Sequence, residues 1–132
     1  MKSDFLNKIN SSFKGRVTLN KKLANLSWFN VGGKASIFFK AEDLNDLLNF
    51  RRDMKKFNVN IKTIGAGSNL LIRDGGFKGT IIKLGKNFSN FSLKKDNMII
   101  AGTAALDKKL SQFALENSLA GFEFLSCIPG SV

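Results

Sequence analysis

A glycine-rich run, Gly65-Ala66-Gly67-Ser68-Asn69, constrains the fold of this chain more than any other feature of its sequence. It directly follows a short apolar segment, residues 61–64, which is typical of a buried strand. Glycines at such a place let successive backbone N–H groups face one point, because no Cβ stands in the way. The loop therefore suits a phosphate group, although a purely structural turn between strands has the same spacing.

Two common phosphate-binding loops are excluded by the neighbouring residues. A P-loop ends in Gly-Lys-Ser/Thr, whereas Gly67 is followed by Ser68 and Asn69. The doubly wound dinucleotide fold needs a third glycine where Leu70 stands, and a helix where this sequence offers a second apolar run, residues 70–72. We therefore expect a ligand held by a loop between strands, with no helix dipole behind the loop.

The segments around the loop predict alternating strands and helices. A turn at 30–33 leads into a strand over 35–40, and a strand over 80–84 follows a tight turn at 74–76 and forms a hairpin with 70–72. An amphipathic helix is expected over 42–57, begun by acidic residues and ended by Asn58. The face expected to be buried carries one basic residue among its apolar ones: Leu44, Leu47, Leu48, Arg51, Met54 and Phe57.

The remaining segments predict less structure. A short helix is expected around residues 5–13, a strand over 98–101 and a helix over 106–119 that is ended by a left-handed Gly121. The second helix places Leu106, Leu110, Phe113 and Ala114 on one face. This last strand and helix have no partner strands in the sequence, so we expect a truncated second unit.

The composition predicts one soluble, cytoplasmic domain. The chain has 132 residues and is 43% hydrophobic, and it has neither an apolar stretch of membrane-spanning length nor a signal sequence at its start. Its one cysteine, Cys127, has no partner for an internal disulfide, as is typical of the cytoplasm. We expect Cys127 to be buried and to act as a small hydrophobic residue.

The net charge of +11 is compatible with a nucleic acid, an anionic membrane surface or a phosphorylated ligand as partner. The positive residues are mostly lysines in runs no longer than two, which favours a solvated surface. A basic nucleic-acid-binding module is the competing hypothesis, because the 13 phenylalanines can stack on bases. Against it, several phenylalanines fall at or beside expected core positions: Phe38, Phe50, Phe57 and Phe113.

Three motifs together resemble one known family. The run from Gly65 to Gly79, GAGSNLLIRDGGFKG, resembles the signature of the UDP-N-acetylenolpyruvoylglucosamine reductases, also called UDP-N-acetylmuramate dehydrogenases. The upstream segment 29–35 is similar to the family's phenylalanine and double-glycine motif, and segments 121–125 and 128–132 resemble its second flavin-contacting segment. The pair Ser27-Trp28 departs from the small hydroxyl residues usual before Phe29, because it contains the large aromatic Trp28. Another flavin-dependent oxidoreductase of the same fold stays an open alternative.

The resemblance implies an α+β fold of the PCMH type, in which FAD lies between two α+β subdomains. These would be residues 1–84, including an N-terminal extension, and residues 85–132, the truncated beginning of the second; a substrate-binding domain would be absent. It also implies a reaction of peptidoglycan precursor synthesis, and hence of cell-wall biogenesis, cell shape and division. NADPH reduces the flavin, which passes a hydride to the enolpyruvyl group of a UDP-sugar and gives UDP-N-acetylmuramate. A monomer that binds neither nucleic acid nor membrane is expected, with association possible for a truncated chain.

The resemblance also implies the site residues. The pyrophosphate of FAD would be held by Gly65, Ala66, Gly67, Ser68, Asn69 and Leu70, and the flavin or ribityl side would be lined by Gly102, Thr103, Ile128, Pro129, Gly130, Ser131 and Val132. The family's catalytic residues belong to later segments, so we expect no catalytic residue and no metal here, and no turnover by these 132 residues alone. Since the chain contains no histidine, none of Ser68, Ser126 and Ser131 has a Ser–His partner.

Overall fold

The computed structural model describes residues 13–132. In chain order the elements are β1 (Arg16–Lys22), η1 (Ala24–Leu26), β2 (Lys34–Ala41), α2 (Leu44–Lys55), β3 (Ile61–Ile64), β4 (Phe77–Leu84), η2 (Lys86–Phe88), β5 (Phe91–Leu93), β6 (Ile99–Ala101), α3 (Asp107–Glu116) and η3 (Glu123–Cys127). The predicted strands at 35–40, 61–64, 80–84 and 98–101 and both later helices are confirmed within a few residues. The helix predicted over 5–13 lies outside the described residues, apart from Phe13.

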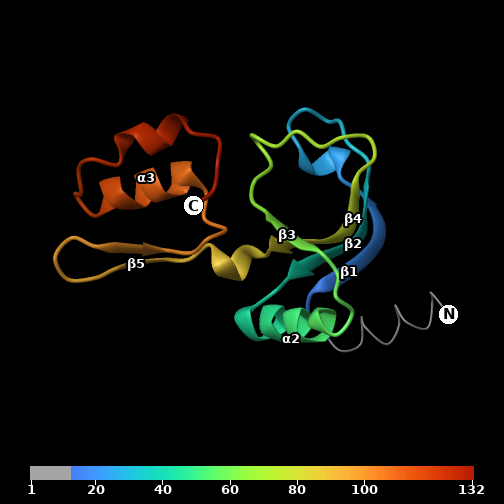
Figure 1. Ribbon diagram of the computed structural model, residues 1–132. Helices are drawn as coiled ribbons and strands as arrows, with labels where there is room; N and C mark the ends of the chain where they lie inside the picture. Colours follow the sequence, from blue (N-terminus) through green and yellow to red (C-terminus); the bar gives the residue numbers. More distant parts are fainter. Residues whose placement is uncertain (1–12) are drawn as a thin grey trace.

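A four-stranded mixed sheet forms the larger part of the molecule (Figure 1). Its order is β1-β2-β4-β3; β1 runs antiparallel to β2, while β4 runs parallel to both β2 and β3. Neighbouring parallel strands cannot be joined by a tight turn, so the connection from β3 to β4 must travel back along the sheet. The glycine-rich segment, residues 65–76, is that connection.

This topology corrects two predictions about the loop region. The hairpin between residues 70–72 and 80–84 is wrong, because 65–76 contains no strand and β4 pairs with β2 and β3 instead. The apolar run 70–72 is explained by Ile72, which packs against a cluster on the sheet. Strand β3 is also less buried than expected, since it lies at the edge of the sheet and its middle two residues are exposed. The turn at 74–76 is confirmed, with Gly76 at a φ of +67°.

Helix α2 covers one face of the sheet (Figure 1), and the stripe that it buries matches the predicted one only at Met54 and the half-buried Leu47. Its buried residues are Asp46, Phe50 and Met54, spaced four apart, whereas Leu44 and Phe57 are 59% and 56% exposed. Counting apolar residues alone missed this stripe because it contains a buried carboxylate. The expected ends are close to those observed: Asp43 is the N-cap, and Asn58 has the left-handed φ of +47° just beyond the C-terminus.

Two hydrophobic clusters occupy the two faces of the sheet. Beneath α2, the rings of Phe39 and Phe50 stack with centroids 3.9 Å apart, and Phe13 meets both edge-on. The opposite face carries a second cluster made by Leu23, Ala35, Phe38 and Ile81, against which η1 and the glycine-rich segment pack. Thus Phe38 and Phe50 are core residues as predicted, and Phe57 is not.

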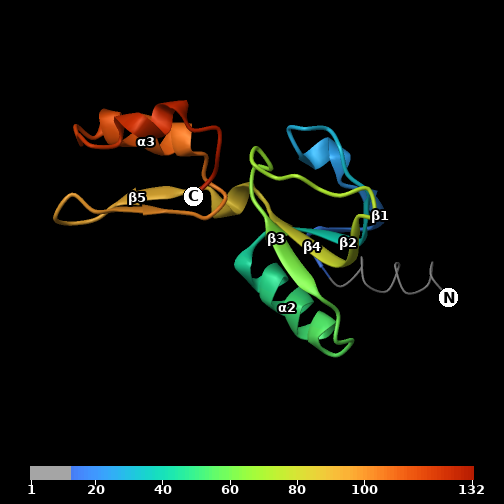
Figure 2. The same cartoon turned by 45° about the horizontal axis from the view of Figure 1, so that its top comes forward.

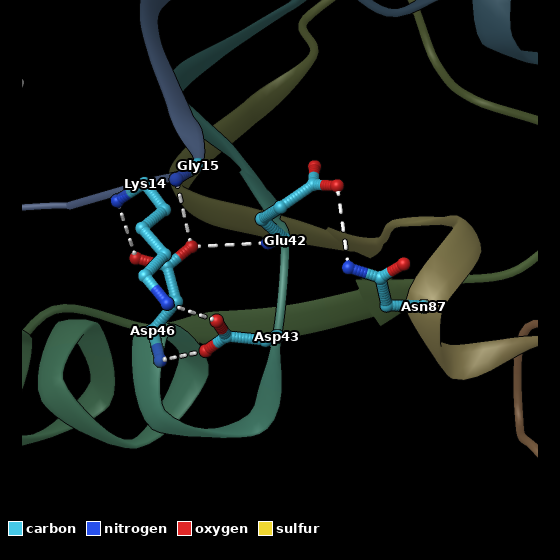
Figure 3. A network of polar contacts seen from close by, with 6 residues as sticks. All are labelled: Lys14, Gly15, Glu42, Asp43, Asp46 and Asn87. Atoms are coloured by element: carbon cyan, nitrogen blue, oxygen red, sulfur yellow. Dashed lines mark hydrogen bonds and ion pairs between the residues drawn. The ribbon is translucent and has the colours of Figure 1, made fainter.

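The buried carboxylate of Asp46 joins three backbone segments (Figure 3). It accepts hydrogen bonds from the N–H groups of Lys14, Gly15 and Glu42 at 3.1, 2.8 and 3.0 Å. Beside it, the Lys14 ammonium pairs with Asp43 at 2.8 Å. These contacts fix the chain just before β1 and the end of β2 to the first turn of α2.

The rest of the chain forms a smaller unit beside the sheet (Figure 2). Strands β5 and β6 pair antiparallel, and α3 packs over them through a stacked contact of Phe91 with Phe113, with centroids 5.2 Å apart. Strand β5 was not predicted from the sequence. Gly121 has a positive φ of +94°, as predicted, but α3 ends earlier, at Glu116, and Ser118 at a φ of +56° is the first left-handed residue after it. Leu106 is the N-cap residue before the helix and is 49% exposed, so it does not share the face of Leu110 and Ala114 as predicted.

The architecture is of the α+β class, as predicted, and no helix in residues 13–132 has the length and apolarity to span a membrane. The prediction for Cys127 is wrong, because its side chain is exposed at the end of η3.

Candidate functional site

The glycine-rich loop is anchored from beneath by the segment that precedes β2. Gly67 is buried at a φ of +80°, and a Cβ there would overlap the carbonyl oxygen of Leu26. The Gly67 carbonyl accepts a hydrogen bond from the N–H of Trp28 at 3.1 Å. Close by, the buried Ser27 hydroxyl donates to the carbonyl oxygen of Leu70 at 2.6 Å. The two residues that depart from the family pattern therefore hold the loop.

The double-glycine motif packs against the second half of the same loop. Gly32 has a φ of +130°, and a Cβ on it would touch the side chain of Ile72. The N–H of Gly33 donates to the carbonyl oxygen of Arg73 at 3.0 Å. Two sequence motifs that lie more than thirty residues apart are thus one packing unit, which explains why both need glycine.

The loop also has backbone donors without a partner. In the part of the chain that the structure describes, the N–H groups of residues 66–69 donate no hydrogen bond. Unpaired N–H groups on a glycine-rich turn are suited to the oxygens of an anion. The loop therefore has a packed side and a side available for a ligand.

A cleft of about 460 Å³ lies between the loop and the smaller unit. From the sheet come the ends of β3 and β4 together with Gly65 and Ala66, and from the other side come Thr103, Ser131 and neighbouring residues. The full lining is Thr63, Ile64, Gly65, Ala66, Lys83, Leu84, Thr103, Ala104, Leu106, Ser131 and Val132. Most of this lining is apolar, with a few polar groups, as is common in cofactor sites.

The C-terminal segment is held against the start of α3. Asp107 donates its N–H to Gly130 at 3.2 Å, and Val132 donates to Ala105 at 3.0 Å. Leu106 and Ser131 pair as an isolated antiparallel bridge. This pairing carries the Ser131 hydroxyl across to the loop, where a Cβ on Gly65 would lie 2.7 Å from it.

A second hollow of about 320 Å³ adjoins the cleft through Ala66 and Leu106. Its lining includes Trp28 and the segment Ile128, Pro129 and Gly130. The glycine-rich loop, the C-terminal motif and Trp28, the residue just before the double-glycine motif, therefore meet around two neighbouring hollows. A larger hollow of about 770 Å³ lies between α2 and β3, but none of the predicted site residues lines it.

The predicted site residues divide into two groups by position. Around the two adjoining hollows lie Gly65, Ala66, Thr103, Ile128, Pro129, Gly130, Ser131 and Val132. Outside their lining lie Gly67, Ser68, Asn69, Leu70 and Gly102. Of these, Gly102 has a packing role, because a Cβ there would overlap the carbonyl group of Phe88.

Sequence reasoning missed Lys83, which belongs to the cleft lining. Partial burial lowers the pKa of Lys83 below its ordinary value, and repulsion from Lys40 lowers it further. Lys83 pairs with Ile64 in the parallel ladder, so it stands beside the residue that enters the loop. Only the pairing of β3 with β4 reveals this, and the sequence had suggested a hairpin instead.

Few groups in the described residues are arranged for acid–base or metal chemistry. The Ser126 hydroxyl donates to the carbonyl of Glu123 at 2.7 Å and lies 3.6 Å from the Cys127 sulfur, on the exposed side of η3. No group of three or more His, Cys, Asp or Glu side chains in residues 13–132 could hold a metal ion. The arrangement is one of binding, with a donor-rich loop facing a mainly apolar wall.

Comparison with known proteins agrees with this geometry. A family model described as "FAD binding domain" matches residues 35–132. A UDP-N-acetylenolpyruvoylglucosamine reductase of Pelagibacter ubique is 46% identical over 134 residues, covering 100% of this chain and 43% of the relative. The protein of the same description in Rickettsia conorii is 48% identical over 119 residues, covering 90% of this chain and 40% of the relative.

Among solved structures, that of the UDP-N-acetylenolpyruvylglucosamine reductase (MurB) from Thermus caldophilus is similar. The two chains superpose with a TM-score of 0.65 at 28% identity, over 90% of this chain and 40% of the other. The chain thus spans about two fifths of the length of the relatives it matches.

Proposed function

This chain belongs to the FAD binding domain family, and on that premise we propose that it forms the FAD-binding part of a reductase that makes UDP-N-acetylmuramate from UDP-N-acetylglucosamine enolpyruvate. The proposed hydride donor is NADPH, and the product is a precursor of peptidoglycan. The reductases from Pelagibacter and Rickettsia support this proposal through their similarity to the chain, because they carry the name of that reaction.

The observation that carries the proposal is the set of unpaired N–H groups at residues 66–69. They belong to a loop in which packing against Leu26 requires a glycine at position 67. These donors suit the diphosphate of FAD, and the mainly apolar cleft suits its flat rings. We assign the diphosphate to residues 65–70, and the ribityl and flavin side to Gly102, Thr103 and residues 128–132. When bound, FAD supplies the capacity to accept and pass on a hydride.

The domain boundary belongs to the same proposal. We place the first subdomain at residues 1–84 and the second at 85–132, so that the cleft lies between them. The four-stranded sheet ends with β4 at Leu84, and the paired strands β5 and β6 belong to a separate sheet. A subdomain boundary at Leu84 therefore gives each subdomain one wall of the cleft.

The test is an FAD titration of the folded 132-residue chain, followed by flavin fluorescence, with Gly65→Ala as the variant and Gly75→Ala as its control. A Cβ at Gly65 meets only the end of the Ser131 side chain, 2.7 Å away, so it should narrow the cleft with little effect on folding. A Cβ at Gly75 meets nothing within 4 Å. We expect saturable binding by the parent and the control, and binding by Gly65→Ala weakened about tenfold, the equivalent of one lost hydrogen bond.

A folded chain that shows no saturable FAD binding, or equal affinities for both glycine variants, would contradict the proposed site. A separate assay addresses catalysis: with FAD, NADPH and the enolpyruvyl sugar supplied, the 132 residues alone should show no substrate-dependent NADPH oxidation. Turnover of about 1 per second or faster would show that catalytic residues lie within this chain.

We further propose a cytoplasmic monomer with no nucleic-acid partner. The burial of Phe38, Phe39 and Phe50 supports the absence of a nucleic-acid partner, because these rings are unavailable for base stacking. Duplex DNA should bind weakly, without sequence preference and with a steep loss of affinity as salt rises. Sub-micromolar binding of a single sequence at physiological salt would favour the nucleic-acid-binding hypothesis instead.

A further inference from the structure

Three basic residues stand in one row across the main sheet. Arg16 of β1 is the register partner of Lys40 of β2, and Lys40 is in turn the register partner of Lys83 of β4. Paired residues on neighbouring strands point to the same face of a sheet, so all three side chains project together. That face is the one without α2, because Lys40 and Lys83 are each two residues beyond Phe38 and Ile81 of the second cluster.

The row opens into a hollow of about 480 Å³, which we name the lysine pocket. Its lining includes Lys40 and Lys83 of the row together with Lys86 from η2 and Lys109 from α3. The other lining residues are neutral: Leu84, Gly85, Ser89, Phe91, Ala104 and Leu106. Lysines from both parts of the molecule thus converge on one volume that contains no carboxylate in its lining.

The charges of the lysine pocket are not neutralised within the described residues. None of its four lysines forms an ion pair there, and Lys109 donates only to the amide oxygen of Gln112 at 3.5 Å. The carboxylate of Glu42 lies beside Gly85 at the rim, but it accepts a hydrogen bond from the side chain of Asn87 at 3.4 Å (Figure 3). A net positive charge therefore remains over the pocket.

Like charges directly opposite each other destabilise a sheet, and two successive pairs of them occur in this row. The lowered pKa of Lys83, caused by burial and by Lys40, shows the same repulsion. An unfavourable arrangement of this kind is relieved by an anion that touches several of the cations at once. Phosphate groups fit best, because lysine ammonium groups act as point charges toward their oxygens.

We propose that the lysine pocket binds a phosphate-bearing anion through Lys40, Lys83, Lys86 and Lys109. The pocket adjoins the cleft through Lys83, Leu84, Ala104 and Leu106, which line both. The phosphate can therefore come from two sources, the diphosphate of a nucleotide in the cleft or a separate phosphorylated molecule. The anion site itself does not depend on the proposed reductase function.

The test uses inorganic pyrophosphate as the probe, in metal-free buffer whose ionic strength is held constant with sodium chloride. The chain, Lys40→Met and the control Lys94→Met are compared by calorimetric titration and by thermal denaturation. Lys94 is an exposed lysine just after β5 and lies outside the pocket. We expect saturable binding by the parent and the control, and binding by Lys40→Met weakened about tenfold or more.

Lys40→Met should weaken anion binding, but in the absence of anion it should raise the stability of the fold. Removing the central charge of the row relieves repulsion on both sides, so Lys40→Met without pyrophosphate should melt a few degrees above the parent. Lys86→Met provides a second variant. Lys86 lies outside the sheet, so pyrophosphate binding should weaken while Arg16, Lys40 and Lys83 keep their arrangement. Absence of saturable pyrophosphate binding by the parent, or equal affinities for Lys40→Met and Lys94→Met, would overturn the proposal.

The source of the phosphate is identified by repeating the titration with FAD present at saturation. Loss of pyrophosphate binding shows that the diphosphate held by residues 65–70 also reaches the lysine pocket through Lys83, and retention assigns the pocket to a separate phosphorylated ligand. Binding of FAD is followed independently by fluorescence in the same samples. A failure of the proposed flavin function is thereby distinguished from a failure of the anion site.

Discussion

The backbone N–H of Trp28, just before the double-glycine motif, donates a 3.1 Å hydrogen bond to the carbonyl oxygen of Gly67, at the point where the glycine-rich loop turns. Directly beneath, the carbonyl of Leu26 takes the space that a side chain at Gly67 would need. Sequence reasoning attributed the need for glycine to the approach of a phosphate. In the structure, glycine is needed at position 67 because the chain packs against itself there. The N–H groups of residues 66–69 stay available for a ligand.

Gly67→Val should therefore unfold the loop as well as release FAD. A side chain at a φ of +80° and in overlap with Leu26 should lower the free energy of unfolding by about 2 kcal/mol or more. Thermal denaturation in the absence of flavin measures this, with Gly75→Ala as the control expected to melt like the parent. A Gly67→Val variant of parental stability that has lost only FAD would instead support the phosphate explanation.

Ser27→Ala should destabilise the loop anchor. Ser27 is buried, donates to Leu70 at 2.6 Å and accepts from the N–H of Phe29 at 3.3 Å, so its removal leaves both partners unsatisfied. We expect a loss of about 1 to 2 kcal/mol in the free energy of unfolding, measured by urea denaturation. Ser92→Ala, at an exposed position of β5, should change it by less than about 0.5 kcal/mol. Equal effects of the two changes would rule out an anchoring role for Ser27.

Asp46→Asn should cost more than any exposed charge change on α2. The carboxylate accepts three backbone N–H groups, and an amide in its place presents a donor toward at least one of them. We expect a loss of about 2 to 3 kcal/mol by urea denaturation. The matched control is Asp53→Asn, which removes an exposed pair with Lys56 and should have a small effect. A small effect at both positions would show that the three N–H groups find other acceptors.

The ion pair of Lys14 with Asp43 should make stability depend on pH at both extremes. Hydrogen bonding to Lys14 lowers the pKa of Asp43 below its ordinary value of 3.8, so its contribution is present above that value and lost as pH falls through the lower folded pKa. The same contact raises the pKa of Lys14 above 10.5, so that contribution is present below 10.5 and lost as pH rises through the raised value.

Asn at position 43 can still cap α2, since asparagine is a good N-cap residue, but it cannot pair with Lys14. The melting temperature of Asp43→Asn should therefore fall less steeply than that of the parent below about pH 4. Asp96→Asn, an exposed position between β5 and β6, should keep the parental slope. Identical slopes for parent and Asp43→Asn would exclude a contribution of this pair.

Thr80→Val tests the one buried side-chain polar atom that has no hydrogen-bond partner among the described residues. Thr80 is fully buried in β4, and its Oγ1 pays for desolvation without a bond in return. Valine has nearly the same shape and a higher strand preference, so the variant should match the parent or gain about 1 kcal/mol. Destabilisation by more than about 1 kcal/mol in urea denaturation would indicate a bond made by the hydroxyl.

Much of the secondary structure followed from local patterns. The strand at β2, the N-cap Asp43 of α2 and the turn at Gly76 are recognisable because each depends on residues next to one another. The face of α2 was not, because its buried stripe contains Asp46, whose partners lie before β1 and at the end of β2. Without those N–H partners, a carboxylate side chain is expected to lie at the surface.

The glycine loop, the strand before it and the family to which the motifs belong could be predicted, since these depend on contiguous residues. The part that the loop plays in the fold depends on strand pairing. Because β3 and β4 are parallel neighbours, the loop must run back along the sheet. This path places Gly67 against Leu26 and Gly65 near Ser131. The pairing of β4 with β2 sets Lys83 beside Lys40. Strand register joins residues that are far apart in the chain, and no local pattern contains it.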